Sequence, residues 1–381
     1  MDKAVAILGV GMHEFGRFPE KSALDMGREA AIMALKDADL DYGDIECGFC
    51  AHWMQPMTIG SEIFCELGMT GIPCSTITGV GSACTTRAVE IAAGLIIGGA
   101  YDTCLVIGVE KMSTPLSPQP STAMDYYGLM GLRFAPGTWA LTATRHMHLY
   151  GTTHEHFAQV AVKSHRNACD NPYAQYRKEV TLEEVLNSRM IAYPIRLLEC
   201  SPITDGATAV VLTSLKKARQ HTTKPVRIIG WGSTSPVPPH SEDNAGFVSP
   251  PGMLLPDTTL TASRAYENTG VGPKDIDVAE VHDAFAPSEL FFIEGLGFCP
   301  LGEGGPFTWE GNTERTGKIP VNPGGGDLSR GNPIGAVGGA MIAELTWQLR
   351  GQAGSRQVQQ PKVALQQNSG GGGEIVMIYS I

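Results

Sequence analysis

One strand–helix plan occurs twice along this 381-residue chain, and this repeat constrains the fold more than any other feature of the sequence. The apolar strand and glycine turn at 5–11 (VAILGVG) recur at 226–232 (VRIIGWG). A short segment that ends in Asp-Ile follows in both halves, at 40–45 and at 270–276. The order of segments therefore predicts an internal duplication, with halves that meet near residues 215–225.

Each half alternates apolar strands with segments of helical spacing. The first half predicts helices at 22–38, at 57–67 and from residue 84 to the glycines at 98–99, with strands at 48–51, 75–79 and 102–109. The second half predicts helices at 260–267 and 331–349, with strands at 277–281 and 363–365. This alternation favours an α/β protein in which helices cover both faces of the sheet.

Two segments interrupt the repeat. The first, 113–200, starts with several prolines and contains helical patterns at 139–150 and 152–167, with capping boxes at Thr152–Glu155 and Thr181–Glu184. The second, 233–257, is proline-rich and reads as an extended loop. We therefore predict a first half formed by 1–112 and 201–222, an inserted loop domain at 113–200, and a second half at 223–381. Long loops on a rigid body commonly select the substrate.

A glycine-rich turn at 78–87 delivers one cysteine to the start of a helix. Gly79 and Gly81 permit backbone conformations that a side chain would forbid. A thiol at a helix N-terminus lies near free backbone N–H groups, which favour the thiolate and can hold an oxyanion. Cys84 is therefore the candidate nucleophile. The alternative is a buried structural cysteine, which is the usual situation of a single free thiol.

Three further features complete a candidate acyl-transfer site. His282 follows the strand at 277–281, where α/β proteins place functional groups. Asn332 lies in a Gly-Asn-Pro turn that corresponds, under the duplication, to the cysteine turn of the first half. A glycine run from Gly370 is expected to follow the strand at 363–365 and to offer backbone N–H groups to a ligand. A nucleophile, an imidazole, a carboxamide and free amides together suit acyl transfer.

Composition and charge exclude several other classes of function. A formal net charge of −11 disfavours nucleic-acid and membrane-surface partners. No apolar run approaches the roughly 20 residues that span a bilayer. Cys47 and Cys50 form a C-x-x-C pair without a second ligand pair, so no metal is expected in this chain. With nine cysteines, an odd number, reduced thiols in a cytoplasm are the economical expectation.

The motifs at 201–207 (SPITDGA), 281–285 (VHDAF) and 321–339 resemble those of the thiolase superfamily, in particular the branch of sterol-carrier-protein-type thiolases. The resemblance covers essentially the whole chain. It implies a five-layer α-β-α-β-α fold of two similar halves, with a loop domain inserted in the first and a homodimeric core. It also implies coenzyme A as a substrate.

The roles of the family's residues transfer unevenly to this chain. The resemblance implies that Cys84 takes the acyl group, that Gly370 completes its oxyanion hole, and that His282 matches the histidine of the branch's HDCF motif. Ala284 stands where that branch has its second, acid/base cysteine, and Asn332 replaces the histidine of the usual G-H-P turn. The remaining Cys-His-Asn set is similar to that of ketoacyl-synthase-III-like condensing enzymes, in which His and Asn hold the thioester oxygen.

The resemblance implies an acyltransferase that cleaves or forms a 3-oxoacyl-CoA by Claisen chemistry through an acyl-cysteine. It also suggests a small zinc-ribbon/OB-fold protein as partner, because relatives in bacteria often work with one. Two alternatives stay open. One is a related carbon–carbon bond enzyme, such as a condensing enzyme, an aromatic acyltransferase or a side-chain aldolase. The other is a non-catalytic scaffold subunit.

Overall fold

The computed structural model describes residues 4–113, 135–222, 224–235, 258–371 and 373–381. The strands are β1 (Val5–Met12), β2 (Cys47–Ala51), β3 (Cys74–Ile77), β4 (Thr103–Lys111), β5 (Met190–Ala192), β6 (Ile195–Arg196), β7 (Asp205–Ser214), β8 (Val226–Thr234), β9 (Val278–Val281), β10 (Val363–Gly370) and β11 (Gly373–Ser380). The helices are α1 (Ala23–Ala38), α2 (Ile59–Leu67), α3 (Cys84–Gly98), α6 (Ala135–Tyr150), α7 (His154–Ala168), α8 (Leu182–Asn187), α9 (Leu215–His221), α10 (Thr258–Thr269), α11 (Ala286–Gly295), α12 (Gly304–Trp309) and α13 (Val337–Arg350). The prolines that open the 113–200 insertion and almost all of the loop predicted at 233–257 lie outside the described residues.

The strand pairing confirms the duplication. Strands β1, β7, β4 and β2 are neighbours in that order, and so are β8, β11, β10 and β9. In each series the first two contacts are antiparallel and the third is parallel. The series meet where β1 pairs with β8 over the short stretch from Val5 to Ile7.

The short turns of the two halves also correspond. Both segments that end in Asp-Ile form a single 3₁₀ turn, Tyr42–Asp44 and Pro273–Asp275. In each turn the aspartate accepts a hydrogen bond from the backbone N–H three residues earlier, at 3.0 Å for Asp44 and 2.8 Å for Asp275. The same side-chain chemistry therefore builds the same turn twice.

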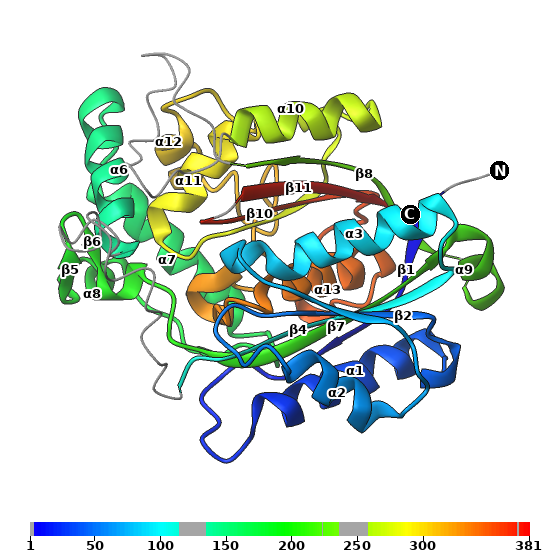
Figure 1. Ribbon diagram of the computed structural model, residues 1–381. Coiled ribbons are helices and arrows are strands. Elements are labelled where there is room, and N and C mark those ends of the chain that lie inside the picture. Colours follow the sequence, from blue (N-terminus) through cyan, green and yellow to red (C-terminus); the bar gives the residue numbers. More distant parts are fainter. Residues whose placement is uncertain (1–3, 114–134, 223, 236–257, 372) are drawn as a thin grey trace.

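Figure 1 shows the layers that result: α1 and α2, then the β4–β7 side of the sheet, then α3 and α13, then the β10–β11 side, and finally α10. This is the expected five-layer arrangement. Because α3 and α13 are covered by strands on both sides, nearly all of α13 is buried, with Trp347 and Arg350 as its less buried residues. A helix that is apolar around most of its circumference belongs in such a layer.

Successive side chains along one strand point to opposite faces of the sheet and so pack into different hydrophobic clusters. On β11, Ile375 and Met377 face the inner core with α3 and α13, whereas Val376 and Ile378 face the outer core with α11. This two-residue period is what a strand buried on both faces requires. The cysteine helix α3 thus lies at the centre of the molecule, between both halves.

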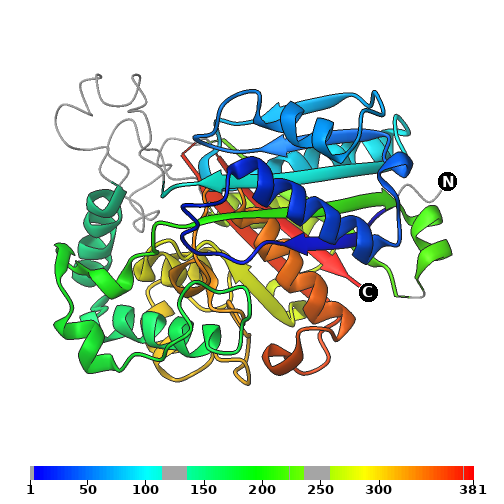
Figure 2. The same cartoon turned by 90° about the horizontal axis from the view of Figure 1, so that it is seen from below.

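The insertion forms a separate group of elements beside the layers. Helices α6, α7 and α8 and the hairpin β5–β6 lie next to α11 and α12 of the second half (Figures 1 and 2). The start of the insertion is tied to the segment that follows its end. The carboxylate of Asp205 accepts hydrogen bonds from the backbone N–H (2.7 Å) and the hydroxyl (2.5 Å) of Ser113. The proposed three-part division of the chain stays a prediction.

Of the two capping boxes predicted in the insertion, one is confirmed and one is wrong. Thr181 caps α8, with its hydroxyl accepting from the backbone of Glu184 at 3.1 Å. Helix α7 instead begins after Thr153, because the hydroxyl of Thr152 is paired with Nδ1 of His146 at 2.8 Å. In the described part of the chain, no helix is long and apolar enough to cross a membrane.

Two elements near the candidate site differ from expectation. Strand β10 continues through Gly370 instead of ending near residue 365, because Gln366 and Asn368 find buried partners inside the protein. The helix predicted from residue 331 begins only at Val337. Before it, a π-helical turn (Gly326–Arg330) ends at Gly331, which has φ +117°, a conformation that side chains disfavour.

Candidate active site

Cys84 is the first residue of α3 and is fully buried. A 3₁₀ turn, Gly81–Ala83, leads into it. This turn packs directly on the end of β10: a Cβ placed on Gly370 would lie 2.0 Å from the carbonyl oxygen of Val80. A glycine is therefore required at residue 370, and the structure brings it next to the cysteine turn.

The surroundings of Cys84 disfavour its thiolate in the ligand-free chain. The pKa of Cys84 is raised to about 11, mainly by burial and also by the nearby Glu110 carboxylate, although backbone hydrogen bonds with Val80 and Gly79 lower it in part. The backbone groups of the turn favour the thiolate, as expected, but desolvation outweighs them in the resting protein.

Glu110 is a buried carboxylate that links the cysteine region to the turn before α13. It accepts hydrogen bonds from the backbone N–H of Trp53 at 2.7 Å and of Gly335 at 3.1 Å, and from the side chain of Gln55 at 2.7 Å. Burial raises the pKa of Glu110, and these donors lower it in part. Glu110 was not predicted as a site residue from the sequence, although a single acidic residue at the end of an apolar strand could have pointed to it.

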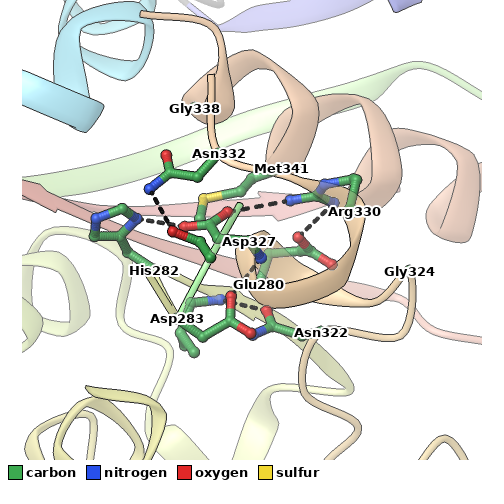
Figure 3. A network of polar contacts seen from close by, with 12 residues as sticks. Glu280, His282, Asp283, Asn322, Gly324, Asp327, Arg330, Asn332, Gly338 and Met341 are labelled. Atoms are coloured by element: carbon green, nitrogen blue, oxygen red, sulfur yellow. Dashed lines mark hydrogen bonds and ion pairs between the residues drawn. The ribbon is translucent and has the colours of Figure 1, made fainter. Parts of the chain in front are cut away.

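His282 follows β9 directly and is 6% exposed. Its backbone N–H donates to Oε1 of Gln367 on β10 at 3.0 Å. Its ring nitrogen Nδ1 lies 2.5 Å from Oδ2 of Asp327, which comes from the π-helical turn. Figure 3 shows the imidazole turned toward Asp327, with Arg330 on the other side of that carboxylate.

Asn332 is held by the 201–207 motif. Its backbone N–H donates to the hydroxyl of Thr204 at 3.2 Å, and its side-chain amide donates to the hydroxyl of Ser201 at 3.4 Å. Its oxygen Oδ1 is buried without a hydrogen-bond partner among the described residues. The backbone of Asn332 is therefore held in place, whereas its side-chain amide makes only one long hydrogen bond.

The end of β10 connects these groups. Gln366 and Asn368 both donate to the hydroxyl of Thr86 on the first turn of α3, at 2.9 and 3.3 Å. Gln367, between them, holds the backbone of His282. The hydroxyl of Thr85 donates to the carbonyl of Gly335, close to the Asn332 turn. The structure thus gathers Cys84, His282, Asn332 and Gly370 around one end of one strand.

Buried charges surround His282. Arg330 contacts Glu280 at 2.8 Å and Asp327 at 3.8 Å, and the side chains of all three residues are inaccessible to solvent. Burial raises the pKa of Glu280 to about 7. Burial, together with the neighbouring Asp327, raises the pKa of Asp283 well above its usual value. Asp327 and Arg330 were also not predicted from the sequence. The available signal was a pair of charged residues within the glycine-rich stretch at 321–339.

None of these groups assembles a metal site in the described residues, where no cluster of three or more His, Cys, Asp or Glu side chains could hold an ion. Among the histidines at the end of α6 and the start of α7, His146 contacts Oε2 of Glu294 at 3.1 Å, and Nδ1 of His156 accepts from the backbone N–H of Thr153 at 3.2 Å.

Comparison with known proteins matches both halves of the chain. The family model described as "Thiolase, N-terminal domain" matches residues 5–216, and the one described as "Thiolase C-terminal domain-like" matches residues 243–380. An acetyl-CoA acetyltransferase of Methanothermobacter thermautotrophicus is 37% identical over 98% of both chains. Sterol carrier protein 2 of Bos taurus is 37% identical over 98% of this chain and 71% of its own length.

Two further similarities concern individual enzymes. The benzoylsuccinyl-CoA thiolase subunit BbsB of Thauera aromatica is 36% identical over 98% of this chain and 96% of its own. Among solved structures, the Ltp2–ChsH2(DUF35) aldolase superposes with a TM-score of 0.87 at 28% identity, covering 99% of this chain and 98% of that one. The fold, the geometry around Cys84 and these matches together show that the chain belongs to the thiolase family, in its sterol-carrier-protein-type branch.

Proposed function

We propose that this thiolase-family acyltransferase cleaves or forms a 3-oxoacyl-CoA through an acyl group carried on Cys84. The observation that supports this most is the position of the buried thiol, at the start of α3 and against the end of β10, where Gly370 and the residues around His282 also lie. A nucleophile with backbone amides and an imidazole nearby suits acyl transfer.

In the proposed reaction, the Cys84 thiolate attacks the C3 carbonyl and forms a carbon–sulfur bond. The C2–C3 bond then breaks, and its electron pair passes to C2, which takes up a proton and leaves as acetyl-CoA. The sulfur of free coenzyme A next attacks the acyl-Cys84 carbonyl, and the Cys84 sulfur leaves. The same steps in reverse give the condensation.

Two groups are proposed to stabilise the thioester oxygen as it gains negative charge. The amide of Asn332 carries a spare N–H, because its single side-chain hydrogen bond is a long one. His282 supplies the second polar group. Gly370 is proposed as the backbone donor for the oxyanion formed at the acylated cysteine. Each such donor typically contributes about a hundred- to a thousandfold in rate.

A second polypeptide is proposed as a partner, on two grounds. The related aldolase is a complex of Ltp2 with the DUF35 protein ChsH2. The benzoylsuccinyl-CoA thiolase relative is likewise named as a subunit. A small zinc-ribbon/OB-fold protein that co-purifies from the native host and raises turnover would support this proposal. Full thiolysis by the isolated chain, without any gain from such a protein, would oppose it.

The test of the nucleophile is direct. The protein is incubated with a 3-oxoacyl-CoA or an acyl-CoA, quenched in acid, digested, and mapped by mass spectrometry. The acyl group is expected on the peptide that contains Cys84, and Cys84→Ser is expected to keep the fold while losing most turnover. An acyl group on Cys74, Cys104 or Cys299, with none on Cys84, contradicts the proposal.

The high structural similarity to an aldolase supports a second candidate, a retro-aldol cleavage that needs no acyl-cysteine. The two candidates differ in what Cys84→Ser does. An aldolase reaction with a 3-hydroxyacyl-CoA would survive this substitution and yield an aldehyde or ketone as product. Thiolysis would not survive it.

A further inference from the structure

We propose that Asp327 is a positioning residue for proton transfer: it accepts a hydrogen bond from Nδ1–H of His282 and so leaves Nε2 of that ring as the proton acceptor of the site. This inference rests on the proposed function, because it assigns the proton transfers that acyl exchange at Cys84 needs. It also supplies a proton acceptor where one is expected to be missing, since the resemblance to the sterol-carrier branch implies that Ala284 stands at the position of an acid/base cysteine.

The geometry begins with the contact between the two side chains. Nδ1 of His282 lies 2.5 Å from Oδ2 of Asp327, and the side chains are 8% and 0% exposed. The two atoms are in contact distance without meeting the angular requirement of a hydrogen bond. Catalytic contacts are often poorly aligned in a ligand-free enzyme and become aligned when substrate binds.

The backbones on both sides of this contact are held in place. The N–H of His282 donates to Gln367 at 3.0 Å, and the N–H of Asp327 donates to Oδ1 of Asp283 at 2.5 Å. Nε2 of His282 has no hydrogen-bond partner in the described part of the chain. One ring nitrogen is therefore engaged by the protein and the other is available to a substrate.

Several charged side chains surround the His282–Asp327 pair. Asp327 faces His282, Arg330 from its own turn, Glu280 from β9, and Asp283 from the segment after β9. Burial and the neighbouring Asp327 raise the pKa of Asp283 well above its usual value. Asp327 and Glu280 both contact the cation Arg330. A carboxylate beside an imidazole stabilises the imidazolium that forms when the ring takes up a proton.

The proposed proton transfers balance through the reaction. Nε2 takes the proton of the Cys84 thiol, and the thiolate attacks the C3 carbonyl. When the C2–C3 bond breaks, Nε2–H returns that proton to C2. In the second half, Nε2 takes the proton of the coenzyme A thiol and returns it to the sulfur of Cys84 as the acyl group leaves.

The first test is the tautomer of His282 in the native protein, from NMR of the chain labelled with ¹⁵N-histidine. The His282 signals are assigned by their loss in His282→Gln. At a pH where the ring is neutral, Nδ1 is expected to be protonated and Nε2 unprotonated. Asp327→Asn is expected to move the proton to Nε2, because an amide N–H donates to Nδ1. A native ring protonated on Nε2 overturns the proposal, whether or not the variant folds.

The second test is kinetic and has a matched control. Asp327→Asn is expected to lower kcat by about a thousandfold to ten-thousandfold, as when an amide imposes the wrong histidine tautomer, with little change in KM. The control is Glu294→Gln, which alters another buried His–carboxylate contact, with His146, inside the insertion. It is expected to keep kcat within a few fold.

Equal losses of kcat in the two variants would show that Asp327 has only a structural role. A variant Asp327→Asn with native kcat would show that Asp327 has no role in proton transfer, and either result overturns the proposal. The proposed function is tested separately. If no acyl group forms on Cys84 of the native protein, acyl transfer through this residue is wrong, yet the tautomer measurement still decides whether Asp327 sets the state of His282.

Discussion

Two opposing effects act on the Cys84 thiol, and their magnitudes decide its resting state. A helix N-terminus typically stabilises a negative charge by about 0.3–1 kcal/mol. Burial raises the pKa of Cys84 to about 11, which corresponds to roughly 3 kcal/mol against the thiolate. The thiol is therefore protonated in the resting enzyme near neutral pH, and acyl transfer requires a proton acceptor as well as a helix terminus.

The pH dependence of alkylation follows from this pKa. The rate at which iodoacetamide modifies Cys84 should rise about tenfold per pH unit from pH 7 to 10, because the thiolate fraction rises by that factor until the pH approaches the pKa. Peptide mapping separates Cys84 from the other cysteines, and the same peptide in urea-unfolded chain is the control, with a plateau near pH 9. A plateau below pH 8 in the folded protein would contradict the prediction.

Asn332 is expected to act on the thioester oxygen and not on the thiol. A carboxamide does not titrate in the accessible range, so it can donate an N–H but cannot remove a proton. Asn332→Ala should lower turnover by about a hundred- to a thousandfold. Asn332→His should be tolerated, because it restores the histidine of the family's usual turn.

The control for Asn332→Ala is the alkylation profile of Cys84, which should not change, because burial and not Asn332 sets the state of the thiol. The hydrogen bond from the backbone of residue 332 to Thr204 is kept in this variant, so the turn should persist. Native steady-state kinetics in Asn332→Ala would show that Asn332 is only a turn residue.

Part of the site could be predicted from sequence because its residues follow strong local signals. Cys84 comes between glycines and a helical pattern, and His282 comes directly after an apolar strand. Asp327 could not be found in this way. Its importance comes from a contact with a residue 45 positions earlier in the chain, and no local periodicity encodes such a contact.

At the scale of elements, a buried ion pair ties the insertion to the second half. Nζ of Lys163 on α7 lies 2.5 Å from Oε1 of Glu289 on α11, and both side chains are fully buried. Lys163 also donates to the hydroxyl of Thr313 and to the carbonyl of Val321, at 3.2 Å each. Burial raises the pKa of Glu289, and Lys163 lowers it in part. Removing the cation would leave a buried carboxyl without its main partner.

Lys163→Met should therefore destabilise the protein by about 3–5 kcal/mol, measured by urea unfolding. The double variant Lys163→Met/Glu289→Leu should recover much of this loss, because no unpaired charge remains. The control on the same helix is Arg166→Met, whose partner is Glu314 and whose side chain is 45% exposed. An exposed pair contributes about 1 kcal/mol or less. Equal losses in Lys163→Met and Arg166→Met would refute this role for the buried pair.

Element boundaries were predicted best where a local cap marks them. Helix α1 begins after Ser22, whose hydroxyl accepts from Asp25 at 3.1 Å, and α3 ends at Gly99 with φ 78°. The end of β10 was missed because its polar residues resemble a loop in sequence. Their partners, such as Thr86 for Gln366, come from distant elements. The start of α13 was missed because the helix was expected to begin directly at Gly331, whereas the turn continues and the helix begins only at Val337.

At the scale of the whole molecule, the five-layer fold was predictable because the same order of strands and helices occurs twice along the chain. The duplication places α3 and α13 in one central layer between the strands of both halves (Figure 1). A site built there draws on residues from both halves, with Cys84 from the first and His282 and Asn332 from the second. The arrangement of the insertion against α11 and α12 has no counterpart in the repeat, so sequence alone could not place it.

The exposed edge of the sheet is the feature that the single chain leaves unexplained. Strand β3 pairs with β2 on one side and ends the described sheet on the other. Its residues Cys74, Ser75 and Thr76 are exposed. Met57 and Met69, in the segments that flank helix α2, are 83% and 90% exposed. An exposed edge strand is a template for pairing with another chain. We therefore expect a second copy of this chain to pair there.

This pairing can be tested by light scattering coupled to size exclusion. The native chain should have twice the mass of its 40.6 kDa monomer. Thr76→Lys should give the monomer, because a twofold interface places two like charges close together. Ile32→Lys changes an exposed apolar residue of α1 and should leave the dimer intact. A native chain that is monomeric at micromolar concentration, or a Thr76→Lys variant that stays dimeric, rules out this interface. Because the exposed residues Thr78 and Gly79 directly follow β3 and lead into the Cys84 turn, the monomeric variant should also lose turnover.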